Sequence, residues 1–196
     1  MNRDNSILYK AAKQNENTIT ELLVNLMRYK YIRDFVLSFL GAPNDFIDTV
    51  KSEDISTQFW IEDKGIPDIR IANSNGIILV ESKIRTDTVL QKNQIDNYTE
   101  IIKNYNKYKQ LIFLIPKNYI EINQIKKCQE RNNYVSIIYW EDLLFEINQN
   151  DICRDNSIVT EVVRFIEYTI IKRDIEVQFE AIEVSLMYRI SDLVNS

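Results

Sequence analysis

The segment of residues 65–84, GIPDIRIANSNGIILVESKI, places charged side chains inside two apolar runs. Asp68 begins the first run, and Glu81 and Lys83 lie near the end of the second. The letters between the runs, Asn-Ser-Asn-Gly, are a strong signal for a turn that joins two antiparallel strands. The segment therefore predicts a β-hairpin that carries two carboxylates and one amine.

Two registers of this hairpin fit the sequence. If residues 73 and 76 close the turn, Asp68 lies opposite Glu81. If residues 75 and 76 form a two-residue loop, Asp68 faces Lys83, and Glu81 is diagonal to it. Both registers place the three side chains on one face of the sheet, because side chains alternate along a strand.

Two carboxylates on neighbouring strands predict a bound cation. Paired positions have Cβ atoms about 5 Å apart, so Asp68 and Glu81 would repel each other unless a cation lay between them. Mg²⁺, or Mn²⁺ in its place, suits such oxygen ligands and needs only one or two protein carboxylates when a substrate supplies phosphate oxygens. Such an ion activates a water and neutralises a scissile phosphate, and Lys83 could hold or deprotonate that water. The pattern predicts phosphodiester hydrolysis.

The composition excludes several other chemistries. The chain has no histidine, which rules out Ser-His and Cys-His nucleophiles and a histidine general base. Its two cysteines lack the C-x-x-C spacing of a structural zinc site. The net charge of −5 argues against a uniformly basic nucleic-acid surface but allows a local basic groove.

The hairpin motif resembles that of a known superfamily. Pro67-Asp68 followed by Glu81-Ser82-Lys83 is similar to the signature of the PD-(D/E)XK nucleases, which share the restriction-endonuclease-like fold. The resemblance implies that Asp68 and Glu81 ligate the metal together with the backbone carbonyl of Ser82. It also implies that Lys83 is the catalytic lysine.

A second motif follows the hairpin. Gln94-Ile95-Asp96-Asn97-Tyr98 resembles the Q-x-x-x-Y motif of the RecB-like and exonuclease branches of that superfamily. In those branches a glutamine on the following helix reaches toward the site, so the resemblance adds Gln94 to the catalytic residues. Gln91 lies one helical turn earlier and is the weaker candidate.

The superfamily often adds an acidic residue from its first helix, for which this chain offers Glu16 and Glu21. At about 100° per residue, Glu16 shares a face with Ile19, Leu23 and Leu26, which must pack on the sheet. Glu21 lies about 140° away from it. Glu16 is therefore the favoured acid.

Hydrophobic periodicity predicts an alternation of helices and strands around these motifs. The order α-β-β-β-α-β-α-β-α indicates an α/β fold with a mixed sheet between helices, and its first six elements match the αβββαβ core of the superfamily. The expected helices cover residues 17–40, 87–108, 120–131, a short stretch from 140, and one or two helices in 156–196; the expected strands cover 55–61, 68–72, 77–84, 110–116 and 134–140.

The length predicts one compact domain. Residues 1–150 form the nuclease-like part, and residues 151–196 form a helical extension that packs on the same domain or makes a dimer seam. The spacing of Ile182, Leu186, Ile190 and Leu193 favours a homodimer. The chain shows no apolar signal region and no apolar run of about 18 residues, so we expect a cytoplasmic protein with no membrane partner.

Two classes of function fit the sequence. The first is a metal-dependent nuclease that acts on nucleic acid, with DNA favoured, in prokaryotic defence or DNA processing. The alternative is a non-catalytic module that keeps the nuclease fold and binds nucleic acid or protein. The complete set of Asp68, Glu81 and Lys83 favours the enzyme.

Overall fold

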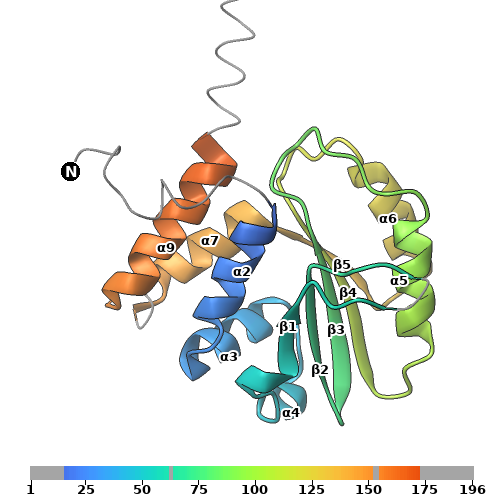
Figure 1. The fold of residues 1–196 in the computed structure, drawn as a ribbon, viewed down its shortest axis with the longest axis horizontal. Helices are drawn as coiled ribbons and strands as arrows, with labels where there is room; N and C mark the ends of the chain where they lie inside the picture. Colours follow the sequence, from blue (N-terminus) through green and yellow to red (C-terminus); the bar gives the residue numbers. More distant parts are fainter. Residues whose placement is uncertain (1–15, 62–63, 152–154, 173–196) are drawn as a thin grey trace, which may run out of the picture.

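The computed structural model describes residues 16–61, 64–151 and 155–172, which form an α/β fold around one open sheet (Figure 1). The sheet is mixed, because β1, β2 and β3 pair antiparallel, whereas β3, β4 and β5 pair parallel. The predicted α/β class and mixed sheet are confirmed. In spatial order, which is also chain order, the strands are β1 (Ile55–Thr57), β2 (Ile69–Asn73), β3 (Gly76–Ser82), β4 (Tyr108–Ile115) and β5 (Val135–Tyr139).

Helices cover both faces of the sheet (Figure 1). Helices α5 (Gln94–Lys103) and α6 (Ile122–Arg131) pack on one face. The other helices pack on the opposite face: α2 (Glu16–Leu26), α3 (Lys30–Phe39), α4 (Asn44–Ile47), α7 (Trp140–Gln149) and α9 (Ser157–Glu167). A 3₁₀ turn, η2 (Ser52–Asp54), precedes β1, and a π-helical turn, η3 (Tyr168–Lys172), follows α9.

Strand β3 lies between two hydrophobic cores, so all of its residues are buried. Ile78 and Val80 face the core beneath α2, α7 and α9. Ile77 and Leu79 face the second core, beneath α5 and α6. This arrangement explains the uninterrupted apolar run that leads into Glu81, because a strand covered on both faces needs apolar side chains on both.

The first predicted helix is wrong in its extent. Residues 17–40 were expected to form one helix, but the chain turns after Leu26 and starts a new helix at Lys30. Tyr29 takes an extended conformation, with φ −74° and ψ 122°, as the residue before α3. No Gly or Pro marks this break in the sequence. The apolar pattern does not reveal it either, because the apolar residues of both helices enter the same core and keep the helical spacing across the break.

Two other predicted elements are shorter than expected. The strand expected over 55–61 ends at Thr57, because Gln58 has a positive φ of 51° that an extended strand cannot accept. Ile61 makes only an isolated bridge with Gly65. The helix expected over 87–108 begins only at Gln94, directly after Asn93, which has a φ of 63°.

The helical prediction for residues 156–196 can be compared only in its first part. Helix α9 begins after Asn156, whose side chain accepts hydrogen bonds from the backbone N–H groups of Ile158 and Val159. The residues of the expected dimer seam, Ile182, Leu186, Ile190 and Leu193, lie outside the described residues. Within the part of the chain that the structure describes, no helix has the length and apolar character needed to span a bilayer.

Candidate active site

The β2–β3 hairpin brings the two predicted carboxylates together. Its register pairs Asn73 with Gly76 and Ile69 with Val80. Asp68 directly precedes β2, so the same register sets it opposite Glu81, which confirms the first of the two predicted registers. The Asp68 carboxylate is held there by the backbone N–H of Ser82, which donates to Oδ2 over 2.7 Å.

Lys83 lies one residue beyond β3 and is kept in line with the sheet. Its backbone N–H donates to the carbonyl of Leu114 over 2.9 Å, which continues the ladder between β3 and β4. Because side chains alternate, Lys83 projects from the same face as Glu81. Its Nζ donates to Oε1 of Glu81 over 2.7 Å and to the carbonyl of Ser82 over 3.2 Å.

The first helix contributes Glu16, as the rotational prediction required. Oε2 of Glu16 accepts a hydrogen bond from Lys83 Nζ over 3.3 Å, and Oε1 accepts one from the backbone N–H of Ile84 over 3.4 Å. Glu21 is exposed on the same helix. The site thus contains three carboxylates, from Glu16, Asp68 and Glu81, around one lysine.

Burial dominates the electrostatics of this cluster. Asp68, Glu81 and Lys83 are all at least nine-tenths buried. Burial, together with the charge of Asp68, raises the pKa of Glu81 to about 7. Burial also raises the pKa of Asp68, although the hydrogen bond from the backbone N–H of Ser82 acts to lower it. Burial alone would lower the pKa of Lys83, but the carboxylates of Glu81 and Glu16 raise it above its ordinary value, so this lysine is held protonated.

The Q-x-x-x-Y residues lie on the first turns of α5, facing the sheet. Tyr98 is buried in the core beneath α5, and both its burial and the nearby Glu81 carboxylate raise the pKa of its hydroxyl. Gln94 is buried one turn earlier, where its Oε1 accepts a hydrogen bond from the backbone N–H of Gln91 over 3.1 Å. No contact of Gln94 with the carboxylates is seen among the described residues, and its catalytic role stays a prediction.

Gln58 is a site residue that the sequence analysis missed. Its Nε2 donates to Oδ1 of Asp68 over 3.2 Å, and its backbone N–H donates to the Asp68 carbonyl over 3.2 Å. The same amide also donates to Asn17 at the start of α2. The left-handed φ of Gln58 aims the side chain at the site, and nothing in a predicted strand over 55–61 signals that conformation.

The oxygen atoms at this position fit a hard divalent cation. Oε2 of Glu81 is buried and has no hydrogen-bond partner among the described residues, although a buried carboxylate oxygen normally has one. The neighbouring Asp68 carboxylate and Ser82 carbonyl add oxygen ligands of the kind that Mg²⁺ prefers. In the described ranges, no group of three or more His, Cys, Asp or Glu side chains is placed to hold a metal ion. Any ion here would therefore take part of its coordination from water or substrate.

Comparisons of the chain with known protein families, curated proteins and solved structures find no match.

Proposed function

We propose that this chain is a divalent-metal-dependent nuclease of the PD-(D/E)XK type, which hydrolyses phosphodiester bonds, with DNA as the favoured substrate. The observation that carries the proposal is the buried pair of carboxylates, Asp68 and Glu81, with Lys83 donating to one of them at the end of the same hairpin. Ordinary strand pairing gives no reason to bury three charged groups at this point, because burial of unpaired charge is strongly unfavourable.

The arrangement of the elements supports the proposal. Helix α2, strands β1 to β3, helix α5 and strand β4 occur in the order αβββαβ of the restriction-endonuclease-like core, with α3, α4 and the turn η2 inserted between α2 and β1. The position of the site residues, at the end of β3 and at the start of α2, also supports it. The restriction-endonuclease-like assignment is part of the proposal and rests on this order and on the motif.

Each residue then has a chemical role. Asp68 and Glu81 would hold Mg²⁺ or Mn²⁺ together with the Ser82 carbonyl. When bound, the ion would neutralise charge on the scissile phosphate and lower the pKa of a water molecule. Lys83, held protonated, donates hydrogen bonds that orient the attacking water and offset the negative charge that develops on the phosphate.

Glu16 and Gln58 position these groups rather than react. Glu16 accepts from Lys83 and so fixes the direction of its amine. Gln58 donates to the Asp68 carboxylate and so fixes its orientation. Such outer contacts typically change metal affinity or activity by about 10–100-fold when they are removed.

The test is a cleavage assay with purified protein in Mg²⁺ or Mn²⁺. Linear, circular and single-stranded DNA and RNA are incubated with the wild type and with Asp68→Ala, Lys83→Ala and Asp48→Ala, all prepared in parallel. Asp48 is an exposed acid outside the site, so its variant controls for loss of a negative charge. We expect Asp48→Ala to cleave like the wild type and the other two variants to be inactive.

Metal titration separates the two inactive variants. Lys83→Ala should still bind the ion in calorimetry, whereas Asp68→Ala should not. Equal cleavage by the wild type and Asp68→Ala would refute the nuclease assignment. Nucleic-acid binding without cleavage in any condition would support the alternative, a non-catalytic module.

A further inference from the structure

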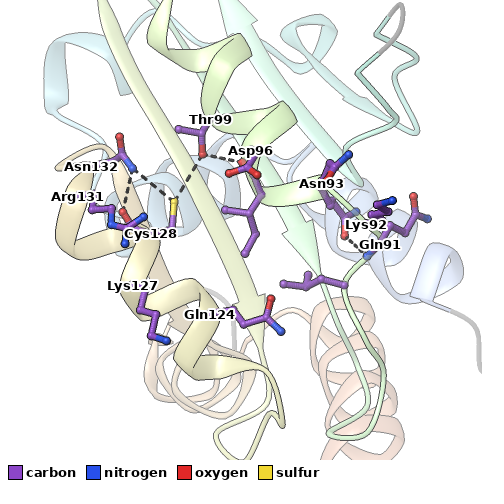
Figure 2. A pocket seen from close by; sticks show the side chains of 13 residues that line it. Gln91, Lys92, Asn93, Asp96, Thr99, Gln124, Lys127, Cys128, Arg131 and Asn132 are labelled. Carbon is purple, nitrogen blue, oxygen red and sulfur yellow. Dashed lines mark hydrogen bonds between the residues drawn. The ribbon is translucent and has the colours of Figure 1, made fainter.

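A pocket of about 440 Å³ lies between α5 and α6, on the face of the sheet to which Glu81 belongs (Figure 2). One wall is formed by residues 90–96 and 99, from the loop before α5 and the first turns of that helix. The other wall is formed by α6 and the residue that follows it, through residues 124, 127, 128, 131 and 132. Its volume falls in the range of about 300–1,000 Å³ that is typical of ligand sites.

The pocket is cationic, although the chain as a whole is acidic. Lys127 and Arg131 line it from α6, and Lys92 lines it from the opposite wall, against a single acid, Asp96 (Figure 2). All three cationic side chains are exposed. Within the described ranges, none of them has a carboxylate partner within 4.0 Å. The pocket therefore carries an excess of positive charge, in a chain of net charge −5.

The remaining lining combines the apolar residues Leu90 and Ile95 with neutral polar groups. Cys128 is buried at the base of the pocket, where its sulfur contacts Thr99 and Asn132 (Figure 2). Gln91 and Gln124 add side-chain amides to the rim. Amide groups both donate and accept hydrogen bonds, which suits a ligand that carries phosphate oxygens and nucleobase edges.

Gln94 links this pocket to the candidate active site. It lines the pocket and lies one turn before Tyr98 on α5. Tyr98 packs in one core with Leu79, which lies two residues before Glu81 on the same face of β3. A strand that enters at Asp68 and Glu81 and continues along α5 therefore passes from the carboxylates into the cationic pocket.

We propose that the pocket binds a nucleotide unit of the substrate strand beside the scissile phosphodiester, with Lys92, Lys127 and Arg131 contacting its phosphates. The inference rests on the proposed nuclease function and specifies where the substrate backbone lies. Phosphate contacts by Lys and Arg release counterions and give affinity that depends on salt but not on sequence. A free nucleotide shares this chemistry, but continuity through Gln94 favours the strand.

The experiment measures binding, without cleavage, in EDTA. Fluorescein-labelled single-stranded and duplex 20-mers are titrated with wild type and with Lys127→Gln/Arg131→Gln, by anisotropy at salt concentrations from 50 to 200 mM. Removing two phosphate contacts should make the slope of log affinity against log salt shallower by about 1.4 for the single strand and about 1.8 for the duplex. The loss of affinity should thus be about tenfold larger at 50 mM than at 200 mM salt.

A matched control separates the pocket from general charge. Lys103→Gln/Lys126→Gln removes the same charge from exposed positions of the same two helices, outside the pocket lining, and should leave both affinity and slope close to the wild type. Lys92→Gln, on the opposite wall, should change the slope by about half as much as the double variant. Thermal melting of each variant confirms that it is folded.

Several results would overturn the inference. Equal losses in the pocket and control variants would show general electrostatics only. Saturable competition by free dAMP, with strand affinity unchanged in Lys127→Gln/Arg131→Gln, would assign the pocket to a free nucleotide. If the wild type binds and cleaves nucleic acid but the pocket variants have no effect, the pocket assignment alone is refuted. If the wild type binds no nucleic acid, the proposed function is refuted as well.

Discussion

Replacing Glu81 by Gln should stabilise the metal-free protein at pH 8 far more than at pH 5. Burial and the neighbouring Asp68 raise the folded-state pKa of Glu81 to about 7, from an ordinary value of 4.5. The folded protein therefore holds this proton more tightly than the unfolded chain does. The contribution of this proton to the free energy of unfolding is fully present below about pH 4.5 and is lost as the pH rises through 7. Gln resembles the protonated carboxyl in shape and charge and does not titrate.

The size of the effect follows from the two pKa values. Between pH 5 and pH 8, the wild type should lose up to about 2.5 kcal/mol of unfolding free energy relative to Glu81→Gln. For a chain of 150–250 residues, 1 kcal/mol shifts the melting temperature by about 2–4 °C. The gap in melting temperature between the two proteins should therefore widen by roughly 5–10 °C from pH 5 to pH 8.

The assay is thermal or urea unfolding of both proteins in EDTA at the two pH values. Addition of Mg²⁺ at pH 8 should then raise the melting temperature of the wild type but not of Glu81→Gln, because a ligand stabilises only the folded state that binds it. A difference in stability between the two proteins that does not change with pH would refute the raised pKa of Glu81. A variant that is less stable than the wild type at pH 8 would also refute it, because the ionised carboxylate would then have adequate partners in the folded protein.

Four further substitutions test the positioning of the site and the packing of the hairpin. Glu16→Gln should reduce cleavage by roughly 10–100-fold, whereas Glu21→Gln, on the exposed face, should match the wild type; the reverse ranking would contradict the helix rotation. Gln58→Leu should weaken metal binding in calorimetry by a similar 10–100-fold, and unchanged affinity would deny it a positioning role. Gly76→Ala should lower stability in urea unfolding by about 1–3 kcal/mol, because its Cβ would lie 2.5 Å from the Tyr108 carbonyl; an unchanged midpoint would count against that packing.

The central hairpin could be predicted because its information is local. Alternating side chains and the Asn-Ser-Asn-Gly turn restrict the register to two choices within about 20 residues, and both place Asp68, Glu81 and Lys83 on one face. Glu16 could be predicted because helical rotation relates it directly to Ile19, which is fully buried. In both cases the face of each side chain depends only on spacing within one element.

The missed features depend on contacts between distant segments. The break after Leu26 carries no Gly or Pro signal, since it is set by the packing of α2 and α3 into one core. Gln58 reaches Asp68 only because its φ is positive, which propensity does not predict for glutamine. The pocket between α5 and α6 joins residues about 40 positions apart, Lys92 and Arg131, which no pattern within one element could have paired.

The charge of the site argues for a divalent ligand rather than a structural ion pair. A structural pair would match one carboxylate to Lys83, and a buried pair contributes little to stability compared with apolar packing. Here Glu16 and Glu81 share that lysine, while Asp68 is held by the Ser82 N–H and Gln58, so the four charged groups sum to −2 when all are ionised. Burial is the main cause of the raised pKa of Glu81, and the negative charge of Asp68 adds to it. A divalent cation would remove the excess and displace the proton, which is why metal binding should be weaker at low pH.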